Sequence, residues 1–332
     1  MMPFTLSRAD DVSAAVTQGN RGPGTKYLGG GTNLVDLMKM GVEHPAHLID
    51  INRIPLATVE ENANGIRIGA LVRNSDLAAH PLILQRYPLL SQALLSGASP
   101  QIRNMATVGG NVLQRTRCFY FYDPTYKECN KRLPGSGCAA LNGYNRIHAI
   151  LGASDHCIAV HPSDMAVALT ALDARIVVAS SSQSGRAERS IPIANFYRLP
   201  GDTPQIETEL KPGELITAVD LPAASPQSRA NYLKVRDRNS FAFALVSVAA
   251  QVELEGNRIK DARIALGGVA LKPWRVPAAE QALRGKEAGA AAFREAADIL
   301  VRGAKPHRFN AFKIELARRS IVRALSTASQ LA

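Results

Sequence analysis

The sequence from residue 27 to residue 34 is Tyr27-Leu28-Gly29-Gly30-Gly31-Thr32-Asn33-Leu34, and it joins a strand-like segment to an apolar, helix-patterned segment. Glycines allow the backbone to approach a ligand closely, and a helix start offers unpaired N–H groups at the positive end of a dipole. The stretch therefore suits a phosphate or pyrophosphate, and a tight structural turn is the alternative. Leu34 stands where the third glycine of the dinucleotide fingerprint belongs, and no Walker lysine follows, so neither of those motifs is matched.

A second glycine turn, Asn104-Met105-Ala106-Thr107-Val108-Gly109-Gly110-Asn111, has similar chemistry. Its paired glycines are flanked by small hydroxyl and amide side chains, which can hydrogen-bond a polar ligand in a confined space. Two such turns in one chain favour a ligand cradle over a purely structural role. Neither turn contains a Ser/His/Asp or Cys/His arrangement, so the sequence shows no machinery for hydrolysis.

The expected strands and helices divide the chain into three units. Residues 1–57 alternate strand-like and helical segments, which favours an α/β arrangement there. Residues 58–222 form a second unit, and the turn formers from Pro222 to Gln227 indicate a linker before a third unit at 228–330. Helices are expected at 10–18, 33–40, 74–79, 88–98, 163–172, 278–284, 290–302 and 311–325, and strands at 26–28, 47–51, 58–59, 66–68, 174–179, 242–253 and 263–269.

The composition is typical of a soluble globular protein, since 46% of the 332 residues are hydrophobic and 20% are charged. No run of about 18 apolar residues is present, so no membrane span is expected. The net charge of +11 raises the question of nucleic-acid binding, but no nucleic-acid motif accompanies it, which favours a solvated surface or one that meets an acidic partner chain. The N-terminus lacks the pattern of a secretory signal, so we expect a cytoplasmic protein or one exported to the periplasm with a signal-bearing partner.

The four cysteines of the chain, Cys118, Cys129, Cys138 and Cys157, all fall within one window of 40 residues. Four thiolates are the number that a tetrahedral zinc ion or an iron–sulfur cluster requires. The surrounding segment is rich in glycine, proline and asparagine and has the character of a long ordered loop. Because a loop of this length inside a compact domain needs something to organise it, a metal centre is favoured.

Spacing alone leaves several interpretations of the cysteines open. Disulfides are disfavoured because a reducing compartment is the default without an export signal. Zinc sites generally use paired Cys-x-x-Cys knuckles, which this window lacks. An iron–sulfur cluster tolerates widely separated ligands, because its bulk reaches several loops at once. Aromatic and basic side chains interleaved in the same window resemble a nucleic-acid stacking surface, but aromatic packing around a cluster needs fewer assumptions.

The two glycine turns and the segment after the linker resemble one family, in order, across essentially the whole chain. The first turn and the stretch from Ile102 to Asn111 are similar to the FAD-binding signatures of the xanthine dehydrogenase family's flavin subunits. Tyr232-Leu233-Lys234-Val235-Arg236, followed by Phe241-Ala242, resembles the segment after their linker. The cysteine insert, at about 115–157, is absent from most of that family; it resembles the middle subunit of bacterial periplasmic aldehyde oxidoreductases, where the insert carries a 4Fe–4S cluster.

This resemblance implies an α+β chain with a vanillyl-alcohol-oxidase-like (PCMH-type) FAD-binding fold of two α/β subdomains, followed by a C-terminal α/β domain. It implies that the first turn wraps the FAD pyrophosphate, that Asp164 accepts hydrogen bonds from FAD hydroxyls, and that Lys234 approaches the polar edge of the flavin, where a positive charge stabilises the reduced form. A helix N-cap is the alternative role for Asp164. The cofactor-binding residues implied are Lys26, Tyr27, Leu28, Gly29, Gly30, Gly31, Thr32, Asn33, Leu34, Ala98, Thr107, Gly110, Asn111, Asp164, Ile216 and Lys234. Gly97 departs from the relatives that carry an aromatic stacked on the flavin.

The same resemblance makes Cys118, Cys129, Cys138 and Cys157 ligands of a 4Fe–4S cluster. It implies a two-electron oxidation of an aldehyde, with water supplying the oxygen, at a molybdenum cofactor in a large partner subunit. A small partner with 2Fe–2S clusters would pass electrons to the FAD of this chain, which would deliver them to an external acceptor. No substrate-oxidising residue is expected in this chain. The alternatives are a flavin subunit of a xanthine or purine dehydrogenase that reduces NAD, and a zinc-stabilised nucleic-acid-binding protein.

Overall fold

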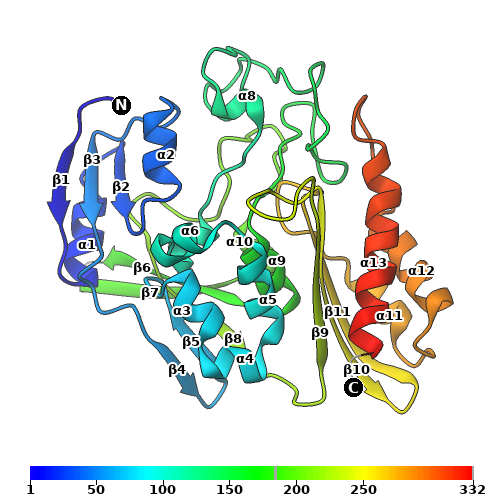
Figure 1. Cartoon of the computed structure of the whole chain (residues 1–332). Helices are drawn as coiled ribbons and strands as arrows, with labels where there is room; N and C mark the ends of the chain where they lie inside the picture. Colours follow the sequence, from blue (N-terminus) through cyan, green and yellow to red (C-terminus); the bar gives the residue numbers. More distant parts are fainter. Residues whose placement is uncertain (183–184, 331–332) are drawn as a thin grey trace.

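The chain begins with a small parallel sheet that carries the first glycine turn at one end. The computed structural model describes residues 1–182 and 185–330. Strands β1 (Thr5–Arg8), β2 (Thr25–Leu28) and β3 (His47–Asp50) pair in the order β1-β3-β2, all parallel. Helices α1 (Val12–Gly19) and α2 (Leu34–Lys39) connect them. The first glycine turn therefore lies between the end of β2 and the start of α2 (Figure 1).

The second sheet is antiparallel, and the helices of the middle part of the chain pack around it. Its strands lie in the order β4-β5-β8-β6-β7, with bounds β4 (Val59–Asn62), β5 (Gly65–Gly69), β6 (Arg175–Ser182), β7 (Gly185–Pro192) and β8 (Leu215–Pro222). The helices are α3 (Asn74–Ala79), α4 (Pro81–Arg86), α5 (Pro88–Ser96), α6 (Pro100–Met105), α7 (Val108–Val112), α9 (Asp164–Ala171) and α10 (Ile193–Phe196). All eight residues of α9 are buried, so this helix lies at the centre of the core.

The C-terminal region is an antiparallel sheet, and the helices of this region cover one of its faces. Strands β9 (Arg229–Val235), β10 (Val246–Glu255) and β11 (Arg258–Gly267) lie in the order β11-β10-β9, and α11 (Pro277–Leu283), α12 (Ala290–Leu300) and α13 (Phe312–Gln330) pack against them. Alternation along β10 sends Val246, Val248 and Ala250 into the core shared with these helices, while Ala249 faces the core around α9. The sheet therefore lies between two helical layers (Figure 1).

A long segment of turns separates α7 from α9, and we refer to residues 115–157 as the cysteine insert. Its one helix in the described chain is α8 (Phe119–Tyr122). The insert lies beside α2 and the start of α13 at the top of the molecule in Figure 1. Lys313, fully buried on α13, donates from Nζ to the carbonyl oxygens of Ile147 and His148, at 3.3 and 2.8 Å. Among the described residues, no helix has the length and apolar character of a membrane span.

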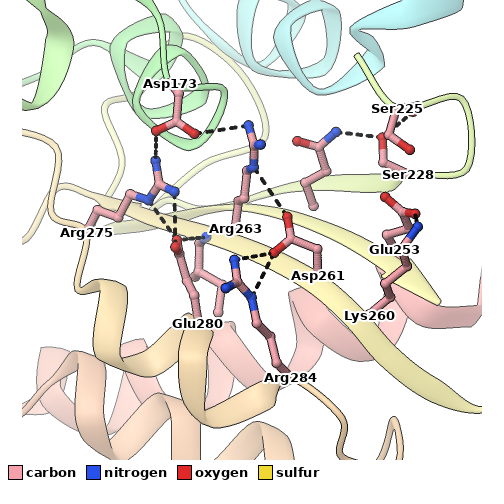
Figure 2. Close-up of polar contacts among 12 residues, drawn as sticks. Asp173, Ser225, Ser228, Glu253, Lys260, Asp261, Arg263, Arg275, Glu280 and Arg284 are labelled. Carbon is pink, nitrogen blue, oxygen red and sulfur yellow. Dashed lines mark hydrogen bonds and ion pairs between the residues drawn. The ribbon is translucent and has the colours of Figure 1, made fainter. Parts of the chain in front are cut away.

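A charged network fixes the C-terminal end of α9 to the C-terminal sheet (Figure 2). The carboxylate of Asp173 pairs with the guanidinium groups of Arg263, at 3.0 Å, and Arg275. Arg275 also donates to the Thr170 carbonyl at 2.9 Å and pairs with the buried carboxylate of Glu280 at 2.7 Å. Since α9 begins at Asp164, this network helps to hold the position of a side chain expected at the cofactor.

Most of the expected elements are confirmed, and the antiparallel second and third sheets confirm the α+β class. The helix expected at 74–79 is α3 with the same bounds. The helix expected at 88–98 ends at Ser96, because Gly97 is extended and Ala98 has a positive φ of 53°. The sequence patterns do not predict β1, β7, β8 or β9. Five consecutive residues of β8, Leu215–Val219, are buried, so this strand lacks the alternation by which a half-buried strand is recognised.

Candidate functional site

A large cavity opens between the second glycine turn, the cysteine insert and the loop after β9. Its volume is about 1110 Å³, more than the ~300–1,000 Å³ of common ligand pockets, which is enough for a dinucleotide. Seven of the residues expected to bind FAD lie on its wall: Thr32, Asn33, Ala98, Gly110, Asn111, Asp164 and Lys234. Phe119 and Tyr122 of the insert line the opposite side. The cavity therefore joins residues that are far apart in the sequence.

The two glycine turns touch each other, which explains why glycines are needed there. A Cβ atom on Gly30 would lie 1.9 Å from the Met105 carbonyl oxygen, and one on Gly29 would lie 3.1 Å from Thr107 Oγ1. Gly31 has a φ of 72°, a conformation that side-chain-bearing residues rarely adopt. Any side chain at Gly30 would therefore push the turns apart.

Several polar groups beside the cavity have no partner within the described part of the chain. The backbone N–H groups of Gly30, Gly31, Thr32 and Asn33 donate no hydrogen bond to another described residue. Asn33 Nδ2 and Asn74 Oδ1 are buried and unpartnered as well, although both residues line the cavity. Consecutive free N–H groups at a turn before a helix form an anion-binding concavity. These residues therefore fit the diphosphate and polar groups of FAD.

A buried ion pair lies on the cavity wall. Lys234 Nζ is 2.7 Å from Asp164 Oδ2 and donates to the Ser96 carbonyl at 3.0 Å. The Tyr232 hydroxyl donates to Asp164 Oδ1 at 2.7 Å, and burial raises the pKa of Tyr232 well above its ordinary value. The N-cap of α9 is Ser163, whose Oγ accepts from the Ala166 N–H, so Asp164 is not the cap. A Cβ added at Gly97 would lie 3.3 Å from Asp164 Oδ2, so a larger residue there would crowd this ion pair.

The remaining expected residues lie behind the wall rather than on it. Thr107 is buried and caps α7 by accepting from the Gly110 N–H at 3.2 Å. Ile216 is buried in the core on β8, where the structure does not bring it to the cavity. The Tyr27 hydroxyl donates to the Gly213 carbonyl at 2.7 Å, and burial raises its pKa to about 12. Lys26 is exposed, and Leu28, Gly29, Gly30, Gly31 and Leu34 form the frame of the first turn without lining the cavity.

Sequence reasoning did not identify several residues that the structure brings to the site. Asn74 begins α3, lines the cavity and has a buried, unpartnered side-chain oxygen, but no motif distinguishes it in the sequence. Arg103 donates to the Gly97 carbonyl at 2.6 Å and so supports the turn that carries Ala98. Phe241 lies at the rim, about half exposed, with a strained φ of 48°. Two of these residues fall inside segments that resemble the family: Arg103 in the stretch from Ile102 to Asn111, and Phe241 in the segment after the linker.

The four cysteines come together in one apolar cluster of the insert. Cys118, Cys129 and Cys157 are buried, Cys138 is half-buried, and all four are free thiols. Cys129 and Cys138 face each other across an isolated bridge between their backbones. The Ala159 N–H donates to Cys157 Sγ at 3.5 Å. Backbone N–H groups also act against the burial that raises the pKa of two other cysteines: those of Phe121 and Tyr120 at Cys118, and those of Ala140, Ile158 and Leu141 at Cys138. Such donors stabilise thiolate ligands rather than neutral thiols.

Burial favours the neutral thiol at Cys118 and Cys157. Burial raises the pKa of Cys118 to about 12 and that of Cys157 to about 11. His148 Nε2 lies 3.1 Å from Cys118 Sγ, and burial lowers the pKa of this histidine to about 4, so the ring is neutral. In the described ranges, no group of three or more His, Cys, Asp or Glu side chains is arranged to hold a metal ion.

A buried charge cluster attaches the insert to the rest of the chain. Lys131, whose side chain is 1% exposed, pairs with Glu207 and donates to the Pro204 carbonyl at 2.8 Å. Arg115 pairs with the same Glu207 at 2.9 Å and with Glu43, which follows α2. Burial alone would raise the pKa of Glu207, but the cations of Lys131 and Arg115 outweigh it and lower the pKa to about 2.

Comparison with known proteins first defines the class of protein. Residues 2–224 match the family model of the FAD-binding domain in molybdopterin dehydrogenase, and residues 231–328 match that of the CO dehydrogenase flavoprotein C-terminal domain. The solved carbon monoxide dehydrogenase of Hydrogenophaga pseudoflava superposes with a TM-score of 0.76 at 27% identity, covering 99% of this chain and 98% of that one. The fold is therefore the PCMH-type FAD-binding fold with its C-terminal flavoprotein domain.

Individual relatives narrow the assignment further. The aldehyde oxidoreductase FAD-binding subunit PaoB of Escherichia coli (strain K12) is 53% identical over 329 residues, covering 99% of each chain. The glyceraldehyde dehydrogenase medium chain of Sulfolobus acidocaldarius is 30% identical, covering 86% of this chain and 82% of that one. This chain belongs to the FAD-binding subunits of the molybdenum hydroxylase family, whose members are parts of oxidoreductases.

Proposed function

We propose that this chain is the FAD-carrying electron-transfer subunit of a heterotrimeric, molybdenum-dependent aldehyde oxidoreductase. The observation that carries the proposal is the cavity beside two touching glycine turns, where four consecutive N–H groups of the first turn have no partner among the described residues. When bound, FAD supplies the exchange of single electrons with iron–sulfur centres and of one or two with an external acceptor. The similarity to PaoB, by its name an aldehyde oxidoreductase subunit, supports the substrate class.

In this proposal, the chain's own residues bind and orient the cofactor. The N–H groups of the first turn bind the diphosphate, and Asn111 and Gly110 bind from the second turn. Lys234 holds a positive charge beside the flavin, and Asp164 and Tyr232 fix its position through a chain of hydrogen bonds. Phe119 and Tyr122 of the insert exclude water from the opposite wall. No residue of this chain removes a proton or hydride from the aldehyde.

We further propose that Cys118, Cys129, Cys138 and Cys157 hold a 4Fe–4S cluster. Four cysteines in one apolar cluster, three of them buried, and backbone N–H groups that favour the thiolate of Cys118, Cys138 and Cys157 support thiolate ligation. A large molybdenum-cofactor subunit and a small 2Fe–2S subunit would complete the enzyme, and co-export with a signal-bearing partner would place it in the periplasm. A xanthine or purine dehydrogenase that reduces NAD is the alternative.

Spectroscopy of the purified complex tests the proposal. We expect flavin absorbance, a broad cluster absorbance bleached by dithionite, and about four irons more than two 2Fe–2S clusters account for. A Cys129→Ser variant should lose these extra irons and keep the flavin bands. A complex with full flavin and unchanged iron in that variant would contradict the cluster while leaving the FAD assignment intact. Assays with aldehydes and with NAD distinguish the proposed enzyme from its alternative.

A further inference from the structure

Asn52, which no motif in the sequence singles out, donates hydrogen bonds to the backbone of the first glycine turn. It follows β3, and its Nδ2 donates to the carbonyl oxygens of Gly29, at 3.1 Å, and Leu28, at 3.3 Å. The same nitrogen donates to Asp50 Oδ1 at 2.8 Å, which fixes the orientation of the amide. In a trans peptide the C=O and the following N–H point in opposite directions, so an amide that donates to the Gly29 carbonyl helps to orient the Gly30 N–H away from Asn52.

Arg73 connects this amide to the second glycine turn. It lies at the N-terminus of α3, where its Nη2 donates to Asn52 Oδ1 at 3.2 Å and its Nη1 donates to the Met105 carbonyl. The Met105 carbonyl is the group that faces Gly30. A single guanidinium therefore binds the amide that supports one turn and the carbonyl that borders the other. The planar fork of arginine suits two acceptors at a fixed separation.

The backbone around Arg73 also pairs with the second turn. The Asn74 N–H donates to the Ala106 carbonyl at 2.9 Å, and the Val108 N–H donates to the Val72 carbonyl at 3.0 Å. The second turn is thus fixed to residues 70–74, whereas the first turn is joined to them by side chains, through Asn52 and Arg73. The spacing between the turns depends on this side-chain link and on the contact at Gly30.

We propose that Arg73 and Asn52 are positioning residues, which clamp the two glycine turns at the spacing that a dinucleotide diphosphate requires. The inference rests on the proposed role of the turns in binding the FAD diphosphate. It assigns no direct contact with the cofactor to either side chain. Ligands that carry a diphosphate should therefore depend on the clamp, and flavins without one should not.

The test measures binding to the full chain after its flavin has been removed. The variants are Arg73→Met, Asn52→Ala, the double variant, and Arg53→Met, which removes a neighbouring exposed arginine as a charge control. The ligands are FAD, ADP and riboflavin, followed by fluorescence or calorimetry, and the thermal midpoint of each flavin-free variant is recorded. We expect about tenfold weaker binding of FAD and ADP in both single variants, little further loss in the double variant, and unchanged riboflavin binding.

Each other result has a definite meaning. Arg73→Lys should restore part of the FAD affinity, because an ammonium can reach one of the two acceptors. Unchanged FAD and ADP binding would overturn the clamp, as would an equal loss for all three ligands together with a lower thermal midpoint. Equal losses in Arg53→Met would show that only the net charge matters. If the unmodified chain bound riboflavin but not FAD, the proposed role of the turns would fail, and the clamp with it.

Discussion

The FAD cavity and the cysteine insert share a wall but are built in opposite ways. The cavity is hollow, and N–H groups of the first turn and two asparagine side chains beside it lack partners among the described residues. The insert is filled, since three of its cysteines are buried among apolar side chains and its buried charges are paired. The cavity is thus preformed for a ligand that arrives from outside, whereas the insert is held by apolar packing, by charge pairs with the rest of the chain and by whatever its sulfurs bind.

The largest effect should come from breaking the charge cluster of the insert. Glu207→Gln leaves the buried ammonium of Lys131 without a charged partner, and removing one member of a buried pair costs about 3 kcal/mol. Chemical denaturation of the purified protein measures this loss. Glu209→Gln is the control, because its pair with Arg198 is exposed at 3.3 Å and is worth less than about 1 kcal/mol. Equal losses of unfolding free energy in Glu207→Gln and Glu209→Gln would show that the charge cluster of the insert stabilises the chain no more than an exposed ion pair does.

The same carboxylate predicts an acid dependence. The pKa of Glu207 is lowered from 4.5 to about 2 in the folded chain, so its contribution is complete above pH 4.5 and is lost as the pH falls toward 2. Lys131 and Arg115 face it, and so does His161, whose pKa burial lowers to about 4. The stability difference between the unmodified chain and Glu207→Gln should therefore shrink below pH 4.5. A constant difference down to pH 3 would disprove the charged pair.

The next effect concerns the cavity. Gly30→Ala places a Cβ 1.9 Å from the Met105 carbonyl oxygen, and the overpacking should separate the turns. We expect FAD to bind about 30-fold more weakly, or about 2 kcal/mol, as measured by flavin fluorescence. Gly289→Ala is the matched control, since nothing lies within 4 Å of its added Cβ and its φ is −170°. Unchanged FAD affinity in Gly30→Ala would show that the turns do not bind the cofactor.

A third variant tests Asp164, a carboxylate on the cavity wall that already has hydrogen-bond partners. Tyr232→Phe removes the hydroxyl that donates to Asp164 at 2.7 Å, and a hydrogen bond to a charged acceptor contributes about 2 kcal/mol. Tyr197→Phe removes an equally buried hydroxyl that donates to a neutral carbonyl, that of Val112, at 2.9 Å, and should cost about 1 kcal/mol. Unfolding free energies of the two variants measure the difference. Equal costs would mean that the hydrogen bond to Asp164 contributes no more to stability than one to a backbone carbonyl.

The two regions also differ in how far the sequence could predict them. The glycine turns and the cysteine window are local patterns, so their residues were identified without a structure. Burial of Ile216 in the core and the links made by Asn52 and Arg73 depend on which strands become neighbours, and no local pattern carries that information. The fold followed from the same local motifs through family resemblance. Strands such as β8 escaped because continuous burial removes the period-two alternation.

The smallest effect lies at the border between the regions, where Ser163 caps α9. Its Oγ accepts from the Ala166 N–H at 2.9 Å and donates to Asn111 Oδ1 at 2.6 Å, so one hydroxyl serves both the helix and a residue on the cavity wall. Ser163→Ala should cost about 1 kcal/mol of unfolding free energy. Ser99→Ala removes only a longer cap bond of 3.3 Å, to Ile102, and should cost less. If FAD affinity also falls in Ser163→Ala and not in Ser99→Ala, the hydroxyl orients Asn111 for the cofactor; equal affinities would limit Ser163 to capping the helix.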